Sequence, residues 1–175
     1  MENQNELSDR WASILLKDDE ALQQHLFSLL SERVTANAYG TDSVIAEQLI
    51  LLPVGLRAMG ATHHLDVSLT LDSITWHFGN FGEPRFVALT EAGLRELGLS
   101  EMADCFLEAS EIILPILDEI MAGDRREVIE QHGLEARVDE LDRRAWDMDG
   151  GKVKTSLIYS AWIRYAREYP GRVFG

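Results

Sequence analysis

The chain has 175 residues, 46% of them apolar, and a formal net charge of −14 at pH 7. This length and apolar content fit one soluble domain whose core needs neither disulfides nor a structural metal. Thirty acidic residues against sixteen basic ones exclude direct binding to nucleic acid, because such a protein needs the opposite charge.

The sequence also carries signals about compartment. A single cysteine, Cys105, can form no internal disulfide, which fits a reducing environment. The first ten residues, MENQNELSDR, are polar and acidic, unlike a signal peptide. The longest apolar run, 49–56, is far too short to cross a bilayer. We therefore expect a cytoplasmic protein without a membrane partner.

Helical periodicity dominates the first third of the chain. Apolar residues recur at three- and four-residue spacing over 7–15 and again over 22–34, which predicts two amphipathic helices. A third helix is expected over 44–59. It contains Pro53, which removes a backbone donor and clashes with the preceding turn, so a kink or break is predicted near 49–52.

Residues 60–72 are the least helical part of the pattern. Val67, Leu69 and Leu71 alternate with polar residues, which is the period of a strand. Because no second strand-like run exists to pair with it, we interpret 65–71 as a short, irregular extended segment. Asp72 or Ser73 is then expected to cap a helix that begins at the next residue.

Further helices are predicted over 84–97, 101–121, 135–146 and 156–169. Gly98 is expected to end the first of these, and Pro115 to bend or split the second. The sequence has no internal repeat and no low-complexity linker. The predicted fold class is all-α, with a single compact multi-helix domain over 1–175.

The residues typical of active sites do not form a recognisable motif. His63, His64, Asp66, Asp72 and His77 are metal-ligand types, yet they lack the i, i+4 histidine pair of a helical metal site, and His63 and His64 are expected to point apart. Neither a glycine-rich phosphate loop nor a nucleophile elbow is present. We expect no metal, no cofactor and no catalytic residue, and hence no enzyme. A metal- or small-ligand-binding protein or enzyme using the 63–77 cluster stays as an alternative.

Cys105 follows Asp104 on a helix rich in carboxylates. A reactive thiolate needs positive surroundings, so this cysteine is expected to be a small packing residue.

The negative charge is concentrated in the middle-to-late part of the chain. Residues 1–90 carry −7, residues 91–149 carry −11 and residues 150–175 carry +4. Acids along the helix predicted from 101 step by three or four residues, which places them in a row on one face. The candidate partner-binding residues are this row and the cluster that follows it: Glu101, Asp104, Glu108, Glu111, Asp118, Glu119, Glu127, Glu130, Glu135, Asp139, Glu140 and Asp142.

Three segments carry a resemblance to a known family. In order and spacing, 74–80 (ITWHFGN), 93–98 (GLRELG) and the helix expected over 102–120 resemble a bacterial family of domains otherwise of unknown function, whose best-known members are DNA-mimic proteins. The stretch 157–174 resembles the family's last helix, so the resemblance covers about 40–170. It departs from the family at Asp72 and Ser73, which replace paired glycines, and at Trp76, which replaces Gln. The resemblance implies an all-helical fold and, for the family's best-known type, binding to a bacterial transcription repressor.

Charge and resemblance together predict a non-enzymatic protein whose acidic face occupies the DNA-binding surface of a basic protein. An immunity protein that neutralises a basic toxin would use the same charge. An uncharacterised helical domain whose acids serve solubility is the third alternative. A homodimer also stays open, in which the basic tail meets the acidic middle of a second copy; its cationic residues are Lys152, Lys154, Arg164, Arg167 and Arg172.

Overall fold

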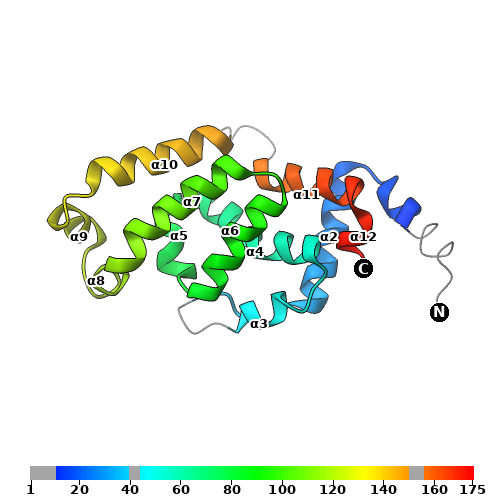
Figure 1. Cartoon of the computed structure of the whole chain (residues 1–175), viewed down its shortest axis with the longest axis horizontal. Coiled ribbons are helices and arrows are strands. Elements are labelled where there is room, and N and C mark those ends of the chain that lie inside the picture. Colours follow the sequence, from blue (N-terminus) through cyan, green and yellow to red (C-terminus); the bar gives the residue numbers. More distant parts are fainter. Residues whose placement is uncertain (1–10, 40–43, 150–155) are drawn as a thin grey trace.

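The computed structural model describes residues 11–39, 44–149 and 156–175 (Figure 1). Over these ranges the regular secondary structure is entirely helical, which confirms the predicted all-α class. Residues 11–15 are helical, and the further helices of the first half are α2 (Asp19–Arg33), α3 (Ile45–Leu49), α4 (Val54–Leu71), α5 (Ile74–Phe81) and α6 (Pro84–Glu96). Those of the second half are α7 (Ser100–Ile113), the 3-10 turn η1 (Leu114–Ile116), α8 (Leu117–Ala122), α9 (Arg125–Gln131), α10 (Glu135–Asp149), α11 (Leu157–Glu168) and α12 (Pro170–Val173).

Prolines and one glycine set several helix boundaries as predicted. The break before α4 falls at 50–53, and Pro53 precedes the first helical residue. Pro115 lies in the 3-10 turn that separates α7 from α8. After α6, Gly98 adopts φ +76°, a backbone conformation that glycine enters without a Cβ clash.

The predicted extended segment at 65–71 is wrong, because these residues form the last two turns of α4. The helix is buried around most of its circumference: Leu65, Asp66, Ser68 and Leu69 are all less than a tenth exposed. A helix covered on several sides does not show the single apolar stripe of an amphipathic one, so its sequence pattern is misleading. Ser68 remains compatible with the helix because its Oγ donates to the carbonyl of His64 (3.0 Å).

Helix α5 shows what the aromatic segment at 74–80 contributes to the fold. The Ser73 hydroxyl accepts a hydrogen bond from the Trp76 N–H (3.2 Å), so Ser73 is the cap predicted for this position. Ile74 and Phe78, one turn apart, are fully buried. The segment therefore serves mainly to fill the core.

Helix α4 is the centre of the molecule and packs most extensively against α6. It also contacts α5, α11 and α12. Gly93 permits the close approach of α6, since a Cβ there would lie 3.0 Å from the Ala58 carbonyl oxygen of α4. Two buried hydrogen bonds stabilise this region. Thr90 Oγ1 donates to the Ala61 carbonyl, and Trp162 Nε1 donates to Thr62 Oγ1; both donor–acceptor distances are 3.0 Å.

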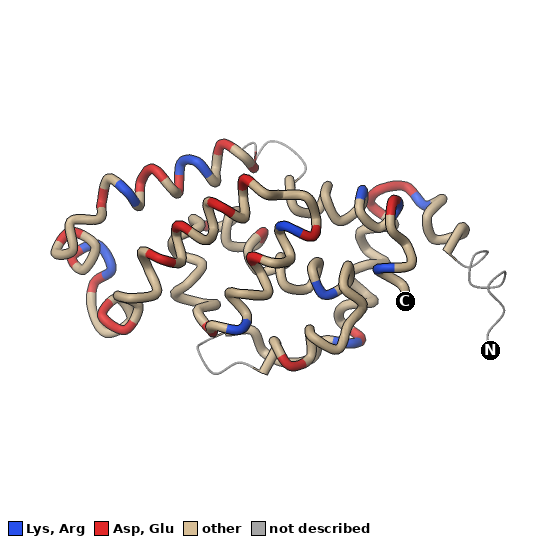
Figure 2. Tube along the Cα trace, viewed as in Figure 1, with Lys and Arg blue, Asp and Glu red and all other residues tan. Residues whose placement is uncertain are grey.

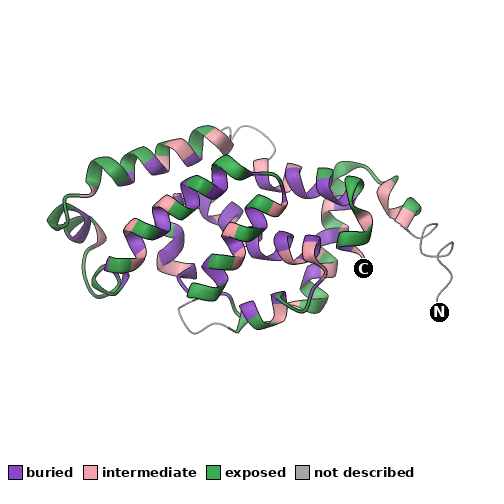
Figure 3. Ribbon diagram, viewed as in Figure 1, coloured by how far each residue is buried: buried purple, intermediate pink, exposed green. Residues whose placement is uncertain are grey.

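The buried side chains form one continuous core that runs from Leu22 in α2 to Val173 in α12. Helices α8, α9 and the start of α10 lie at one end of the long axis, and α2, α11 and α12 lie toward the other (Figure 1). Buried residues follow the central helices, whereas much of α10 is exposed (Figure 3). The α8–α10 end is therefore a helical projection with a large solvent-facing surface.

We expect Gly93→Ala to destabilise the protein, because its methyl group would press on the backbone of α4 at Ala58. Overpacking of this kind lowers the free energy of unfolding by about 1–3 kcal/mol. The matched control is Gly79→Ala in α5, where an added Cβ has no neighbour within 4 Å. That change should leave stability unchanged or raise it by up to about 1 kcal/mol, because alanine favours a helix over glycine. Denaturant unfolding measures both, and equal effects of the two variants would contradict the close α4–α6 contact.

Candidate functional site

The predicted acidic row on α7 is interrupted by arginines from neighbouring helices. Asp104 pairs with Arg95 Nη2 of α6 (2.9 Å). Glu108 pairs with two arginines of α10, Arg144 (3.0 Å) and Arg137. The two middle carboxylates of the row thus hold α7 to α6 and α10, and their charges are balanced within the protein.

Three other predicted acids also have internal partners. Glu140 pairs with Arg137 one turn away (2.8 Å), and Glu119 lies 3.0 Å from His132 Nε2. Asp142 turns toward α5, where its carboxylate accepts hydrogen bonds from the N–H (3.0 Å) and the hydroxyl (2.9 Å) of Thr75. Burial raises the pKa of Asp142, while these hydrogen bonds and the charge of Arg125 act in the opposite direction. Asp142 is an anchor between α10 and α5.

The remaining seven predicted acids are exposed, and no Lys or Arg nitrogen of the described chain lies within 4 Å of their carboxylates. Six of them lie on α8, α9 and the adjoining ends of α7 and α10 (Figure 2). Only Glu101 lies apart, at the start of α7. We name these six the acidic end: Glu111, Asp118, Glu127, Glu130, Glu135 and Asp139.

The acidic end stands on a structured base. Val128 and Ile129 of α9 and Val138 of α10 are each less than a tenth exposed, so both helices are held by the core. Asp124 caps α9 by accepting hydrogen bonds from the N–H groups of residues 126 and 127 (2.9 and 3.1 Å). The carboxylates are therefore presented from ordered helices.

The arginines of the C-terminal tail are engaged within the chain. Arg164 donates to the Leu97 carbonyl (3.0 Å), Arg167 pairs with Asp19 (2.6 Å) and Arg172 pairs with Glu96 (3.0 Å). Lys152 and Lys154 lie outside the described residues. These arginines already serve to fasten the C-terminal helices to α2 and α6, which weakens the reason to assign them to a second subunit.

The histidines of the 63–77 cluster pack among aromatic side chains: His77 is fully buried, whereas His63 and His64 are half-buried at the edge of the core. The prediction that His63 and His64 point apart is wrong, since their ring centroids are 5.0 Å apart on α4. Phe27 from α2 and Phe81 from α5 pack against them at 5.2 and 4.7 Å and draw both rings into one aromatic cluster. His77 lies 4.9 Å from Phe81. Over the described ranges, no three His, Cys, Asp or Glu side chains converge as metal ligands do.

Burial keeps these histidines neutral. It lowers the pKa of His64 to about 4, with a further contribution from the charge of His63, and it lowers the pKa of His77 to about 3, with a contribution from His64. Because Ser68 donates to the His64 carbonyl, its oxygen accepts from His77 Nδ1 (2.9 Å), which fixes that tautomer. His77 Nε2 then has no hydrogen-bond partner in the core.

Two further groups are also structural. Asp66 is buried, accepts a hydrogen bond from the Ser156 hydroxyl at the start of α11, and has its pKa raised to about 6 by burial. Cys105 is fully buried, and burial raises the pKa of its thiol. The prediction that Cys105 is a packing residue is confirmed.

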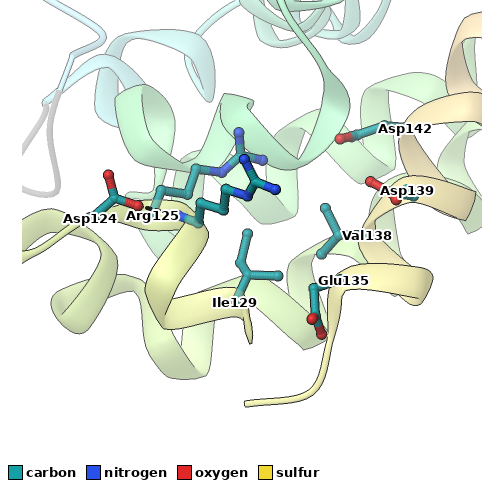
Figure 4. A pocket seen from close by; sticks show the side chains of 8 residues that line it. Asp124, Arg125, Ile129, Glu135, Val138, Asp139 and Asp142 are labelled. Carbon is teal, nitrogen blue, oxygen red and sulfur yellow. Dashed lines mark hydrogen bonds between the residues drawn. The ribbon is translucent and has the colours of Figure 1, made fainter. Parts of the chain in front are cut away.

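One feature of the surface was missed by sequence reasoning. A pocket of about 530 Å³ lies between α9 and α10 and is lined by Arg125 and Arg126 as well as by carboxylates (Figure 4). Consecutive arginines after a capping Asp, inside a strongly acidic segment, were the available signal. Their proximity to Glu135 and Asp139 depends on how α9 and α10 fold together, which the local pattern does not contain.

A comparison of the chain with protein-family models, curated proteins and solved structures finds no match. Separately, no helix in the described ranges has both the length and the apolar character needed to span a bilayer.

The buried titrating groups predict an acid-sensitive fold. Since the unfolded state binds protons near pH 6.5 and native His64 and His77 do so only near 4 and 3, stability should fall as pH drops below 6.5. By pH 4 each of these two histidines should lower the free energy of unfolding by about 3 kcal/mol. The contribution of Asp66 to stability has the opposite sign, because the native state takes up the Asp66 proton at a higher pH than the unfolded state does. It should offset about 2 kcal/mol of the stability lost between pH 7 and 4.

Asp66→Asn separates these contributions. The variant keeps an oxygen for Ser156 but loses the offset, so its free energy of unfolding should fall by about 2 kcal/mol more than that of the native protein between pH 7 and 4. Urea unfolding at a series of pH values measures this difference. Parallel pH profiles for the two proteins would show that Asp66 titrates normally in the fold.

Proposed function

We propose that this protein is a non-enzymatic interaction protein whose acidic end binds a basic protein, at the DNA-binding surface of a bacterial regulator. The observation that carries the proposal is the division among the twelve candidate acids. Five have partners within the chain, whereas the six carboxylates of the acidic end are exposed without an ion pair to the rest of the described structure. Internal salt bridges do not account for these six.

Unpaired like charges close together have a cost that a cationic partner removes. The span 117–142 carries nine acids and three arginines, a net charge of −6 in twenty-six residues. Like charges one helical turn apart, such as Glu135 and Asp139, destabilise a helix by a few tenths of a kcal/mol per pair. Attraction to a basic surface placed against the acidic end would offset this repulsion, and it would raise the association rate of the two proteins.

The presentation of these charges favours a mimic of DNA over a flexible acidic tail. Duplex DNA places one negative charge about every 1.7 Å along its axis, on a stiff scaffold. Because the helices that carry these carboxylates are already packed, binding has to order their side chains but not the backbone. Met121 of α8, 63% exposed among the acids, adds an adaptable apolar contact of the kind that protein interfaces use. The resemblance of 74–120 to the DNA-mimic family supports the same proposal.

The test compares two double variants with the same change in net charge. Glu127→Gln/Glu130→Gln alters the acidic end, and Glu20→Gln/Glu32→Gln alters exposed carboxylates of α2 toward the opposite end. Each immobilised protein is incubated with a bacterial extract at low salt. We expect the native protein and the α2 variant to retain the same basic DNA-binding protein, and the α9 variant to retain several-fold less of it.

The retained protein is then purified and its affinity measured against salt and duplex DNA. Binding should weaken steeply as the salt concentration rises, and a DNA duplex that carries its site should compete. A retained nuclease toxin would instead favour the immunity-protein alternative. Equal retention by both double variants would refute the assignment of the acidic end as the binding surface.

A further inference from the structure

The pocket between α9 and α10 carries both signs of charge on facing sides. Arg125 and Arg126 come from the first turn of α9, and Glu135 and Asp139 come from the first turns of α10. Figure 4 shows Arg125 extending into the space toward the side of α10 that carries Asp139. Ile129 and Val138, both less than a tenth exposed, form an apolar floor between the two sides.

Two of the charged groups that line this pocket are already used by the fold. Asp124 caps α9, and Asp142 is bound to Thr75. The other charges remain available: within the described chain, neither Arg125 nor Arg126 has a carboxylate within 4 Å, and neither Glu135 nor Asp139 has a cation within that distance. Glu135 and Asp139 thus face the two arginines without an ion pair, whereas Arg125 is linked to Asp142 through the Thr75 hydroxyl.

Arg125 is held in place before anything binds. Its Nη2 donates to the Thr75 hydroxyl, and its guanidinium carbon lies 4.9 Å from the centre of the Trp76 ring. This leaves other guanidinium donors free, beside those of Arg126. Two adjacent guanidinium groups are the arrangement that a carboxylate binds well, through several charge-assisted hydrogen bonds.

We propose that this pocket binds a small zwitterion with an apolar side chain, such as a free α-amino acid or a dipeptide. The ligand carboxylate binds Arg125 and Arg126, its ammonium group binds Asp139, and its side chain covers Ile129 and Val138. A simple cation would be repelled by the two arginines, and a simple anion would be repelled by the two acids. A dipolar ligand satisfies both sides, and a volume of about 530 Å³ is within the range of small-molecule sites.

The pocket shares Asp139 with the acidic end, yet the two proposals can be tested separately. Glu127 and Glu130, exchanged in that test, do not line the pocket. Either proposal can therefore fail while the other stands.

Binding is tested with defined probes on the full chain. L-leucine, L-phenylalanine and the dipeptide alanyl-leucine are titrated while the indole N–H signals of the four tryptophans are followed by NMR. We expect a saturable shift of the Trp76 signal, since Arg125 lies over that ring. The amino acids and the dipeptide differ in the distance between their charged ends, so their relative affinities report the spacing of the two sides. N-acetyl-leucine, which lacks the cation, and leucinamide, which lacks the anion, should each bind about tenfold more weakly or worse.

Arg126→Gln and Asp139→Asn should each reduce the affinity about tenfold or more, and neither residue has a described side-chain contact that the fold would lose. The matched controls are Arg143→Gln and Asp147→Asn, which alter an exposed ion pair of α10 that does not line this pocket. These should bind as the native protein does. Absence of a saturable shift at millimolar concentrations, equal binding of the blocked leucines, or equal loss in the control variants would overturn the proposal.

Discussion

The burial of α4 is the constraint on which the rest of the structure depends. Buried polar groups must find hydrogen-bond partners inside the protein, because water does not reach them. Three polar groups of α4, the buried Thr62 and Asp66 and the half-buried His63, do so through one other helix: Thr62 accepts from Trp162, His63 bonds to the Tyr159 hydroxyl (2.9 Å), and Asp66 accepts from Ser156. All three partners belong to α11 or its cap. Helix α11 is therefore bound to α4 by polar contacts, which fix their relative position more specifically than apolar contacts alone.

This constraint also determines which chemistry is left for the surface. Of the residues most often used in catalysis, His77 and Cys105 are fully buried and His63 and His64 are half-buried, and burial disfavours the charged form of each. Charged groups near the α7–α10 contact have a similar structural role, since Glu108 binds two arginines of α10. Among the candidate acids of α7 to α10, those left exposed and without an ion pair are the six of the acidic end, beyond that contact, and Glu101. The location of this surface follows from what the core and the helix contacts have already used.

The sequence was sufficient for features that a few neighbouring residues determine. Pro53, Pro115 and Gly98 each act through their own backbone geometry, and the expected boundaries appear where these residues stand. It failed at 65–71. Here α4 is buried on several sides, so its sequence does not show the apolar periodicity of a half-exposed helix.

The same distinction applies to the charged residues: their spacing is local, whereas their ion pairs depend on the tertiary fold. The spacing of acids along α7 could be read directly, but the pairing of Asp104 with Arg95 and of Glu108 with Arg144 could not. Those partners are nine and thirty-six positions away in the chain and reach α7 only through helix packing. For the same reason the acids could be identified as candidates, whereas the choice among them required the fold.

The two proposed binding events share the carboxylate of Asp139, and this decides how they would influence each other. A zwitterion has no net charge, so filling the pocket leaves the field of the acidic end nearly unchanged beyond a Debye length, about 8–10 Å at moderate salt. The encounter rate with a basic partner should therefore be insensitive to the ligand. Its ammonium group would nevertheless occupy Asp139 at short range, which removes one of six carboxylates from the partner's reach. Any coupling between the sites must act on the dissociation of a formed complex, because only contact, and not attraction at a distance, involves both.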